Sequence, residues 1–155
     1  MAVKKGKRTP KEIVPPSFTV MEVSRIVGAS RRQLDYWDHT GLLSPSLKVG
    51  VGKLFSRQYS VQDIIELKII VRLLRSSLSL QQIRAGFHFI EKRQEDLATS
   101  IISTDGNTMY LYQDDDLLVD TLKQGQMVSR IAVQDLIAEV QEKVNEFTAL
   151  KNGGQ

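Results

Sequence analysis

The side chains in this sequence best suited to recognition chemistry gather in one short segment. They are the guanidinium, amide and phenol groups of Arg31, Arg32, Gln33 and Tyr36. Arginine can hydrogen-bond to guanine and glutamine to adenine, and both side chains can also hold phosphates. At helical spacing Leu34 and Trp37 share an inner face and leave the four polar groups pointing elsewhere. The pattern predicts a helix that contacts DNA, and an ordinary solvated charged face is the alternative.

Two short helices joined by a glycine turn would position these residues. Thr19 with Glu22 three residues later forms a capping box, and Ser30 with Gln33 forms a second one. Gly28 lies between them, where glycine can end a helix in the left-handed conformation without strain. Helix, tight turn and helix is the arrangement that places its second helix in a DNA major groove.

A small basic hairpin is predicted directly after the second helix. Gly50 and Gly52 allow a sharp reversal between residues 47–49 and 53–55. The hairpin would carry three cations, at Lys48, Lys53 and Arg57. A basic hairpin in this place is a wing, whose phosphate contacts position a protein on DNA but read little sequence.

Two further helices are expected after the wing, capped by Ser60 and Ser79. The first should run from Val61 to about Arg75, with one apolar inner stripe and an outer stripe of cations. Gly86 lies inside the second, where glycine costs about 1 kcal/mol relative to alanine. The sequence offers no reason for it.

Charge is distributed unevenly along the chain. Residues 1–93 carry 17 Lys and Arg against 7 Asp and Glu, whereas residues 94–155 carry 4 against 11. Residues 1–93 are therefore suited to binding a polyanion, whereas the acidic residues 94–155 must have another role. Residues 1–17 are basic and proline-rich, which is typical of a disordered arm.

Composition bounds the class of protein. A hydrophobic content of 41% with 25% charged residues is typical of a soluble globular protein. No apolar run approaches the roughly 20 residues that span a bilayer, so no membrane association is expected. Cysteine is absent, which excludes disulfides and thiolate metal sites and fits a cytoplasmic location.

Residues 94–155 are predicted to form a small α+β domain. Strands are expected on either side of the turn Asp105-Gly106-Asn107 and over Gln126–Ile131, with a short helix over Leu117–Lys123 between them. A last amphipathic helix carries apolar residues at heptad spacing, namely Val133, Ile137, Val140, Val144 and Phe147. This seam is the candidate dimer contact. The alternative is a helix that folds back on its own sheet, and the favoured interpretation is a helix that does both.

No catalytic or metal site emerges. The acidic run of Asp114, Asp115, Asp116 and Asp120 lacks the ligand pattern of a calcium loop. His39 and His88 have no cysteine partners, which makes zinc improbable. We therefore expect no cofactor, no metal and no enzymatic activity.

The order of the motifs along the chain resembles that in the N-terminal domain of MerR-family proteins. These proteins are bacterial winged helix-turn-helix transcription regulators. The resemblance covers residues 17–92 and rests on FTVMEVSRIVGASRRQLDYWDHTGLLSP, the basic hairpin, YSVQDIIELKIIVRLL and SLSLQQIRAGF. It implies a homodimer that binds an inverted-repeat operator at a promoter and distorts the DNA. A further contact with RNA polymerase at that promoter is left open. It assigns Arg32 and Tyr36 to the recognition helix and Arg57 to the wing as DNA contacts.

Two positions depart from the family pattern. Asp35 stands where the family usually has arginine, and it should pair with a neighbouring arginine or accept a hydrogen bond from cytosine. The wing is a few residues longer than is typical, and the C-terminal part does not match the long dimerising helix of well-known members.

The sequence thus predicts a mainly α protein: a basic arm over 1–17, a winged helix-turn-helix domain over 18–93, and a dimerisation or effector-binding α+β domain over 94–155. Its function would be sequence-specific transcription regulation on double-stranded DNA. The alternatives are an architectural, excisionase-like DNA-bending protein and a protein-interaction module acting through the C-terminal domain.

Overall fold

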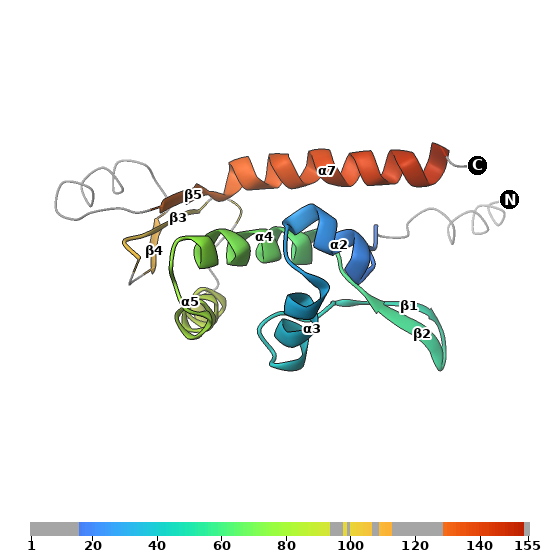
Figure 1. Cartoon of the computed structure of the whole chain (residues 1–155), viewed down its shortest axis with the longest axis horizontal. Helices are drawn as coiled ribbons and strands as arrows, with labels where there is room; N and C mark the ends of the chain where they lie inside the picture. The colour runs from blue at the N-terminus through green and yellow to red at the C-terminus, as the bar shows by residue number, and fades with distance from the viewer. Residues whose placement is uncertain (1–15, 94–97, 99, 107–108, 113–128, 154–155) are drawn as a thin grey trace, which may run out of the picture.

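The computed structural model describes residues 16–93, 98, 100–106, 109–112 and 129–153 of the 155-residue chain. The helix-turn-helix consists of α2 (Val20–Val27) and α3 (Arg31–His39), and β1 (Leu47–Val51) and β2 (Leu54–Gln58) follow it. Next come α4 (Val61–Arg75), α5 (Leu80–Arg93), β3 (Ile101–Thr104), β4 (Met109–Tyr112), β5 (Ser129–Ala132) and α7 (Val133–Gly153). In Figure 1, α7 runs along one side of α4, while α3 and the β1–β2 hairpin lie on the opposite side.

Local hydrogen bonds fix both helices of the helix-turn-helix, as predicted. The Glu22 carboxylate accepts from the Thr19 N–H at 2.9 Å, and the Gln33 side-chain oxygen accepts from the Ser30 N–H at 2.9 Å. Gly28 ends α2 with φ of 78°, a left-handed conformation that favours glycine. The turn therefore follows from short-range sequence signals.

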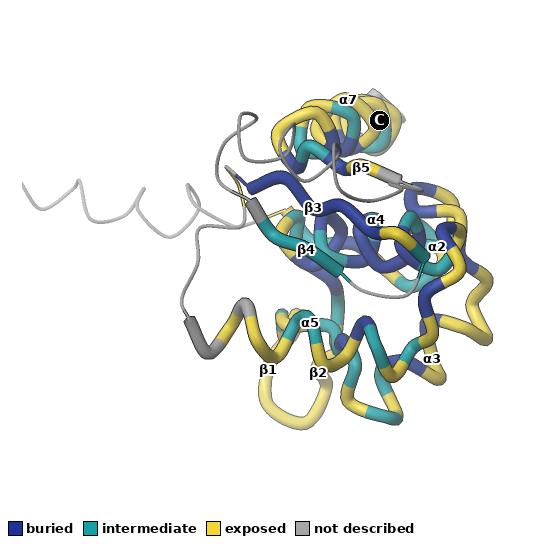
Figure 2. Tube along the Cα trace, turned by 90° about the vertical axis from the view of Figure 1, so that its left-hand side faces the viewer, coloured by how far each residue is buried: buried dark blue, intermediate teal, exposed yellow. Residues whose placement is uncertain are grey.

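Helix α4 is the centre of the molecule. We expected a single apolar stripe, but the structure buries α4 on nearly all sides, because Ile65, Ile69 and Leu73 form a second stripe at i, i+4 and i+8. The dark-blue α4 in Figure 2 shows this burial. Its neighbours include α2, α5 and α7, so α4 joins the N-terminal and C-terminal parts of the chain in one core.

The cations expected on the outer face of α4 also make contacts within the protein. Lys68 donates from Nζ to the Ile26 carbonyl oxygen at 3.3 Å, which ties α4 to α2. Burial lowers the pKa of Lys68. Arg72 pairs with Glu139 of α7 at 3.3 Å. These contacts are half-exposed, so each adds little stability.

The C-terminal sheet has the order β4-β3-β5, with both pairs antiparallel. All four residues of the central strand β3 are buried. The strand predicted over Gln126–Ile131 appears as β5, which ends one residue beyond the predicted end. Some predicted features lie outside the described residues: positions 126–128, the helix Leu117–Lys123, the aspartates at 114–116 and 120, and Asn107.

Helix α5 approaches β4 closely at Gly86. A Cβ atom at this position would overlap the thioether end of Met109, so a larger residue would require that flexible side chain to move.

The seam predicted to join two copies packs instead within the chain. Val133, Val140 and Val144 are buried in the common core, and Ile137 and Phe147 pack partly buried against it. This is the folded-back arrangement that the sequence left open, and the partner is α4 as well as the sheet. As a contact between copies, the seam stays a prediction. Among the described residues, no helix combines the length and apolarity needed to cross a bilayer.

Candidate nucleic-acid interface

The outer face of α3 presents the four residues singled out by sequence. Arg31, Arg32, Gln33 and Tyr36 are all exposed, and the Tyr36 ring is 55% exposed. The inner face is held firmly, because Leu34 and Trp37 are buried in the core. Arg32 and Tyr36 are one turn apart and therefore share a face. Their accessibility agrees with the prediction of a helix that can enter a groove.

Gln33 has a second function that limits its use in base reading. Its side-chain oxygen accepts from the Ser30 N–H at 2.9 Å and completes the cap of α3. A two-bond contact with adenine uses both the oxygen and the nitrogen of the amide. While the cap is intact, only the NH₂ group of Gln33 is left to contact DNA, and its predicted contact with adenine stays a prediction.

Asp35 faces solvent beside Arg31. The Arg31 Nε lies 3.9 Å from Asp35 Oδ2, and the two side chains are 64% and 63% exposed. An ion pair so exposed is weak, worth a few tenths of a kcal/mol. The structure thus shows the predicted pairing with a neighbouring arginine, and it leaves the carboxylate accessible.

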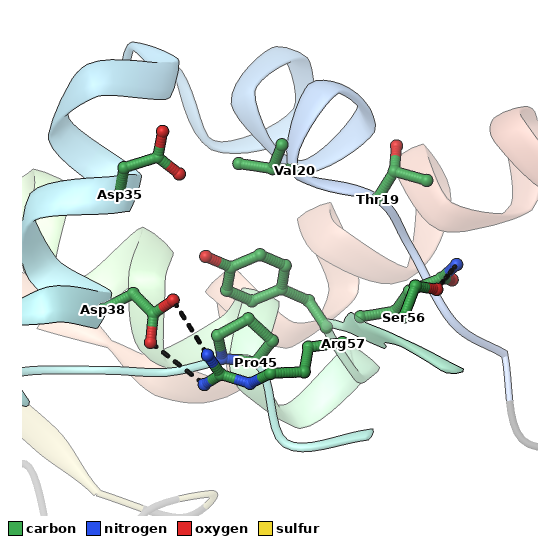
Figure 3. Close-up of a pocket in the computed structure, with 9 residues that line it drawn as sticks. Thr19, Val20, Asp35, Asp38, Pro45, Ser56 and Arg57 are labelled. Carbon is green, nitrogen blue, oxygen red and sulfur yellow. Dashed lines mark hydrogen bonds and ion pairs between the residues drawn. The ribbon is translucent and has the colours of Figure 1, made fainter. Parts of the chain in front are cut away.

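Arg57 joins the wing to α3. The wing is the β1–β2 hairpin, residues 47–58. The Arg57 guanidinium donates to both carboxylate oxygens of Asp38, at 3.0 and 3.3 Å. Figure 3 shows the two bonds crossing from β2 to α3. Burial opposes ionisation of Asp38, but hydrogen bonds from Ser44 and Arg57 and the Arg57 charge outweigh it and hold the pKa of this carboxyl below its ordinary value.

The predicted DNA contact of Arg57 stays a prediction. In the structure its guanidinium binds a carboxylate on α3 and links the wing to that helix. A guanidinium has five N–H donors, so a phosphate contact could be added without breaking the pair. No signal in the sequence singled out Asp38 as its partner.

An open cleft of about 290 Å³ separates the wing from the helices. It is lined by Thr19, Val20, Asp35, Asp38, Pro45, Ser56, Arg57, Gln58 and Tyr59. Burial, together with the charges of Asp38, Asp35 and Asp63, raises the pKa of Tyr59 to about 12, so this phenol stays neutral near pH 7. The carboxylates of Asp35 and Asp38 line the cleft, so it is poorly suited to binding a phosphate. The cleft lies between the wing and α3.

Sequence reasoning missed Arg84 of α5. Its guanidinium donates to the carbonyl oxygen of Thr40 at 2.8 Å and lies 3.4 Å from the Thr40 hydroxyl. Thr40 is the C-cap of α3, so a cation stands at the negative end of the helix dipole. The two residues are 44 positions apart in sequence, and no local pattern links them.

The remaining predicted cations lie on the wing. Lys48 is exposed and its Nζ stands 5.1 Å from the centroid of the Phe55 ring, within range of a cation–π contact. Lys53 is exposed in the turn at the tip. The sequence contains no Asp or Glu between Asp38 and Asp63, so the wing carries cations and no carboxylate. Among the described residues, no group of His, Asp or Glu side chains is arranged to hold a metal ion.

Comparison with known proteins agrees with this geometry. Residues 18–87 match the family described as "MerR HTH family regulatory protein". Three curated proteins named as uncharacterized HTH-type transcriptional regulators, one from Mycobacterium bovis and two from strains of Mycobacterium tuberculosis, are each 38% identical over 124 residues. The match covers 79% of this chain and 55% of each relative, so the chain spans about half the length of the relatives it matches. The segment that carries α2, α3, the wing and α4 is a MerR-family helix-turn-helix domain.

Proposed function

We propose that this protein is a transcription regulator that binds a specific duplex DNA site through α3 and the wing. The observation that carries the proposal is the orientation of Arg32 and Tyr36, which project from a helix whose opposite face is fixed in the core. The basic wing beside α3 supplies phosphate contacts. The names of the mycobacterial relatives support the same function.

The proposed DNA-binding residues divide by role. Arg32 would read a base edge, with Tyr36 and Arg31 beside it on the groove wall. Lys48 and Lys53 would hold phosphates, and Arg57 would keep the wing in place through Asp38. We further propose that two copies bind an inverted repeat, because a two-fold protein matches a palindromic site.

The test begins with a duplex selected from random sequence by the full-length protein. Arg32→Ala should weaken binding to that duplex by about 1–3 kcal/mol and relax the sequence preference at one position. Lys143→Ala is the matched control, since Lys143 is an exposed cation on α7, across α4 from α3. Equal affinities for Arg32→Ala and the unaltered protein would remove α3 as the reading element.

Symmetry is tested separately. Sedimentation of the complex should give two chains per selected duplex, and the footprint should show two half-sites related by a dyad. A single chain on an asymmetric site would overturn the homodimer while leaving DNA binding intact. Several scattered footprints would instead favour an architectural protein.

A further inference from the structure

The outward face of α3 carries a negative side chain among the groups proposed to read DNA. Successive residues of a helix are turned by about 100°, so Asp35 and Tyr36 lie on either side of Arg32. Arg32 itself lies almost directly opposite Leu34 and Trp37, whose side chains are buried. Both Asp35 and Tyr36 are largely exposed. A helix that inserts Arg32 into the major groove therefore inserts the Asp35 carboxylate with it.

The Asp35 carboxylate is only weakly paired within the described part of the chain. Its ion pair with Arg31, at 3.9 Å, is long and exposed. Arg57 also lines the cleft beside Asp35, but its guanidinium binds both carboxylate oxygens of Asp38. In Figure 3 these two bonds end on Asp38, one helical turn from Asp35. Asp35 would therefore reach a DNA groove with most of its hydrogen-bonding capacity unused.

The edges of the bases offer few groups that a carboxylate can bind. An ionised carboxylate only accepts hydrogen bonds. In the major groove the donors are the amino groups of cytosine and adenine, whereas guanine and thymine present only acceptors. A carboxylate that loses water without gaining a donor carries a large free-energy cost. The residue therefore restricts which base pair can stand opposite it.

Cytosine fits this carboxylate better than adenine. The adenine amino group lies between two acceptors, its own N7 and the O4 of the paired thymine. The cytosine amino group has an acceptor on one side only, the O6 of the paired guanine. The second carboxylate oxygen of Asp35 thus meets less repulsion at cytosine. The guanine of the same pair would suit a neighbouring guanidinium.

We propose that Asp35 accepts a hydrogen bond from the 4-amino group of a cytosine at one position of the DNA site and excludes the other bases there. The inference rests on the proposed DNA-binding function and names the base that α3 requires at that position. Asp35 also repels phosphates, so it lowers the affinity for unrelated DNA. Its contribution is to specificity rather than to affinity.

The first test compares the sites that the full-length protein and its Asp35→Ala variant select from random duplexes. The two sites should differ at one position, where the unaltered protein prefers cytosine about tenfold and the variant less than about twofold. The affinity of the variant for an unrelated duplex should rise about threefold, because a negative charge near phosphates is removed. Asp35 is exposed, so the unfolding midpoint should stay unchanged.

The second test removes the amino group from the DNA instead of the carboxylate from the protein. A duplex with 2-pyrimidinone in place of that cytosine lacks only the 4-amino group. Relative to the cytosine duplex, it should bind the unaltered protein about tenfold more weakly than it binds Asp35→Ala, as expected for two groups in direct contact. Glu146→Gln is the matched control, because it neutralises an exposed carboxylate on α7, across α4 from α3. It should leave the selected site and the affinity unaltered.

Failure of this inference is distinguishable from failure of the proposed function. If the unaltered protein selects no site from random duplexes, the function itself is wrong. If it selects one and Asp35→Ala selects the same one, only the role of Asp35 is wrong. A loss of affinity in Asp35→Ala that is equal for all duplexes would show a structural role for this residue, and a preference for adenine at the affected position would overturn the assignment of cytosine.

Discussion

Arg57 of β2 and Asp38 of α3 are joined by two hydrogen bonds, of 3.0 and 3.3 Å, that cross from the wing to the recognition helix. The pair is partly exposed, so its own contribution to stability should be below about 1 kcal/mol. Its effect on DNA binding should be larger, since we expect the pair to hold the wing beside α3.

The first prediction is therefore that Arg57→Ala and Asp38→Asn are non-additive in DNA affinity. Either single change should remove most of the contribution of the wing, and the double variant should lose little more. Arg57→Lys should not restore binding, because an ammonium group cannot bind both carboxylate oxygens as a planar guanidinium does. Gel-shift titration of all variants measures the coupling, and strictly additive losses would show that Arg57 acts on DNA independently of Asp38.

The second prediction concerns Arg84, which caps the C-terminus of α3 from α5. Arg84→Ala should destabilise the protein by about 0.5–1.5 kcal/mol, through the lost hydrogen bond and dipole interaction. Amide hydrogen exchange should accelerate locally at the end of α3. Gln81→Ala, at an exposed position on the same helix, serves as control. Unchanged exchange near Thr40 in Arg84→Ala would contradict the capping role.

The third prediction uses two glycines of the wing. Gly50 has φ of 124°, and a Cβ there would lie 2.5 Å from the Leu54 carbonyl oxygen, which is backbone and cannot swing aside. Gly52 has φ of 57° and open space around it. Gly50→Ala should disrupt the hairpin, whereas Gly52→Ala should cost only about 1 kcal/mol.

Both variants should keep the core intact, because β1 and β2 are almost entirely exposed, as the yellow hairpin in Figure 2 shows. Nuclear magnetic resonance of residues 47–58, with the unfolding midpoint measured in parallel, distinguishes a lost hairpin from a lost fold. Equal spectra for the two variants would refute the strain argument.

The fourth prediction tests where α7 belongs. Leu136 is buried at 1% exposure in the core shared with α4, so Leu136→Ala should destabilise the chain by about 2–5 kcal/mol. Leu150→Ala, at an exposed site on the same helix, should change stability by less than about 0.5 kcal/mol. Denaturant unfolding at several protein concentrations is the measurement. A loss in Leu136→Ala that vanishes at high concentration would place α7 in an interface between copies.

The sequence was a sufficient guide where structure is set by neighbours along the chain. The capping boxes at Thr19 and Ser30 formed as expected, since each needs a partner only three residues away. The heptad spacing of α7 correctly indicated an apolar face. Periodicity cannot say whether that face meets its own chain or another, and here it meets α4.

Contacts between distant residues were beyond such reasoning. Arg84 reaches Thr40, and Arg57 reaches Asp38, only after the core has brought α5 and the wing to α3. From the sequence alone Gly86 only lowers the helix propensity of α5, and its proximity to Met109 is visible only in the structure. In each case the missing information was which surfaces meet, and that is decided by the packing around α4.

The enclosure of α4 also limits how this protein can diversify. A chimera that joined its first 93 residues to a foreign domain would expose the part of α4 that packs against α7 and β5, unless the graft brought a matching surface. Any change in the C-terminal half must therefore preserve its fit against α4, and the N-terminal half is constrained in the same way.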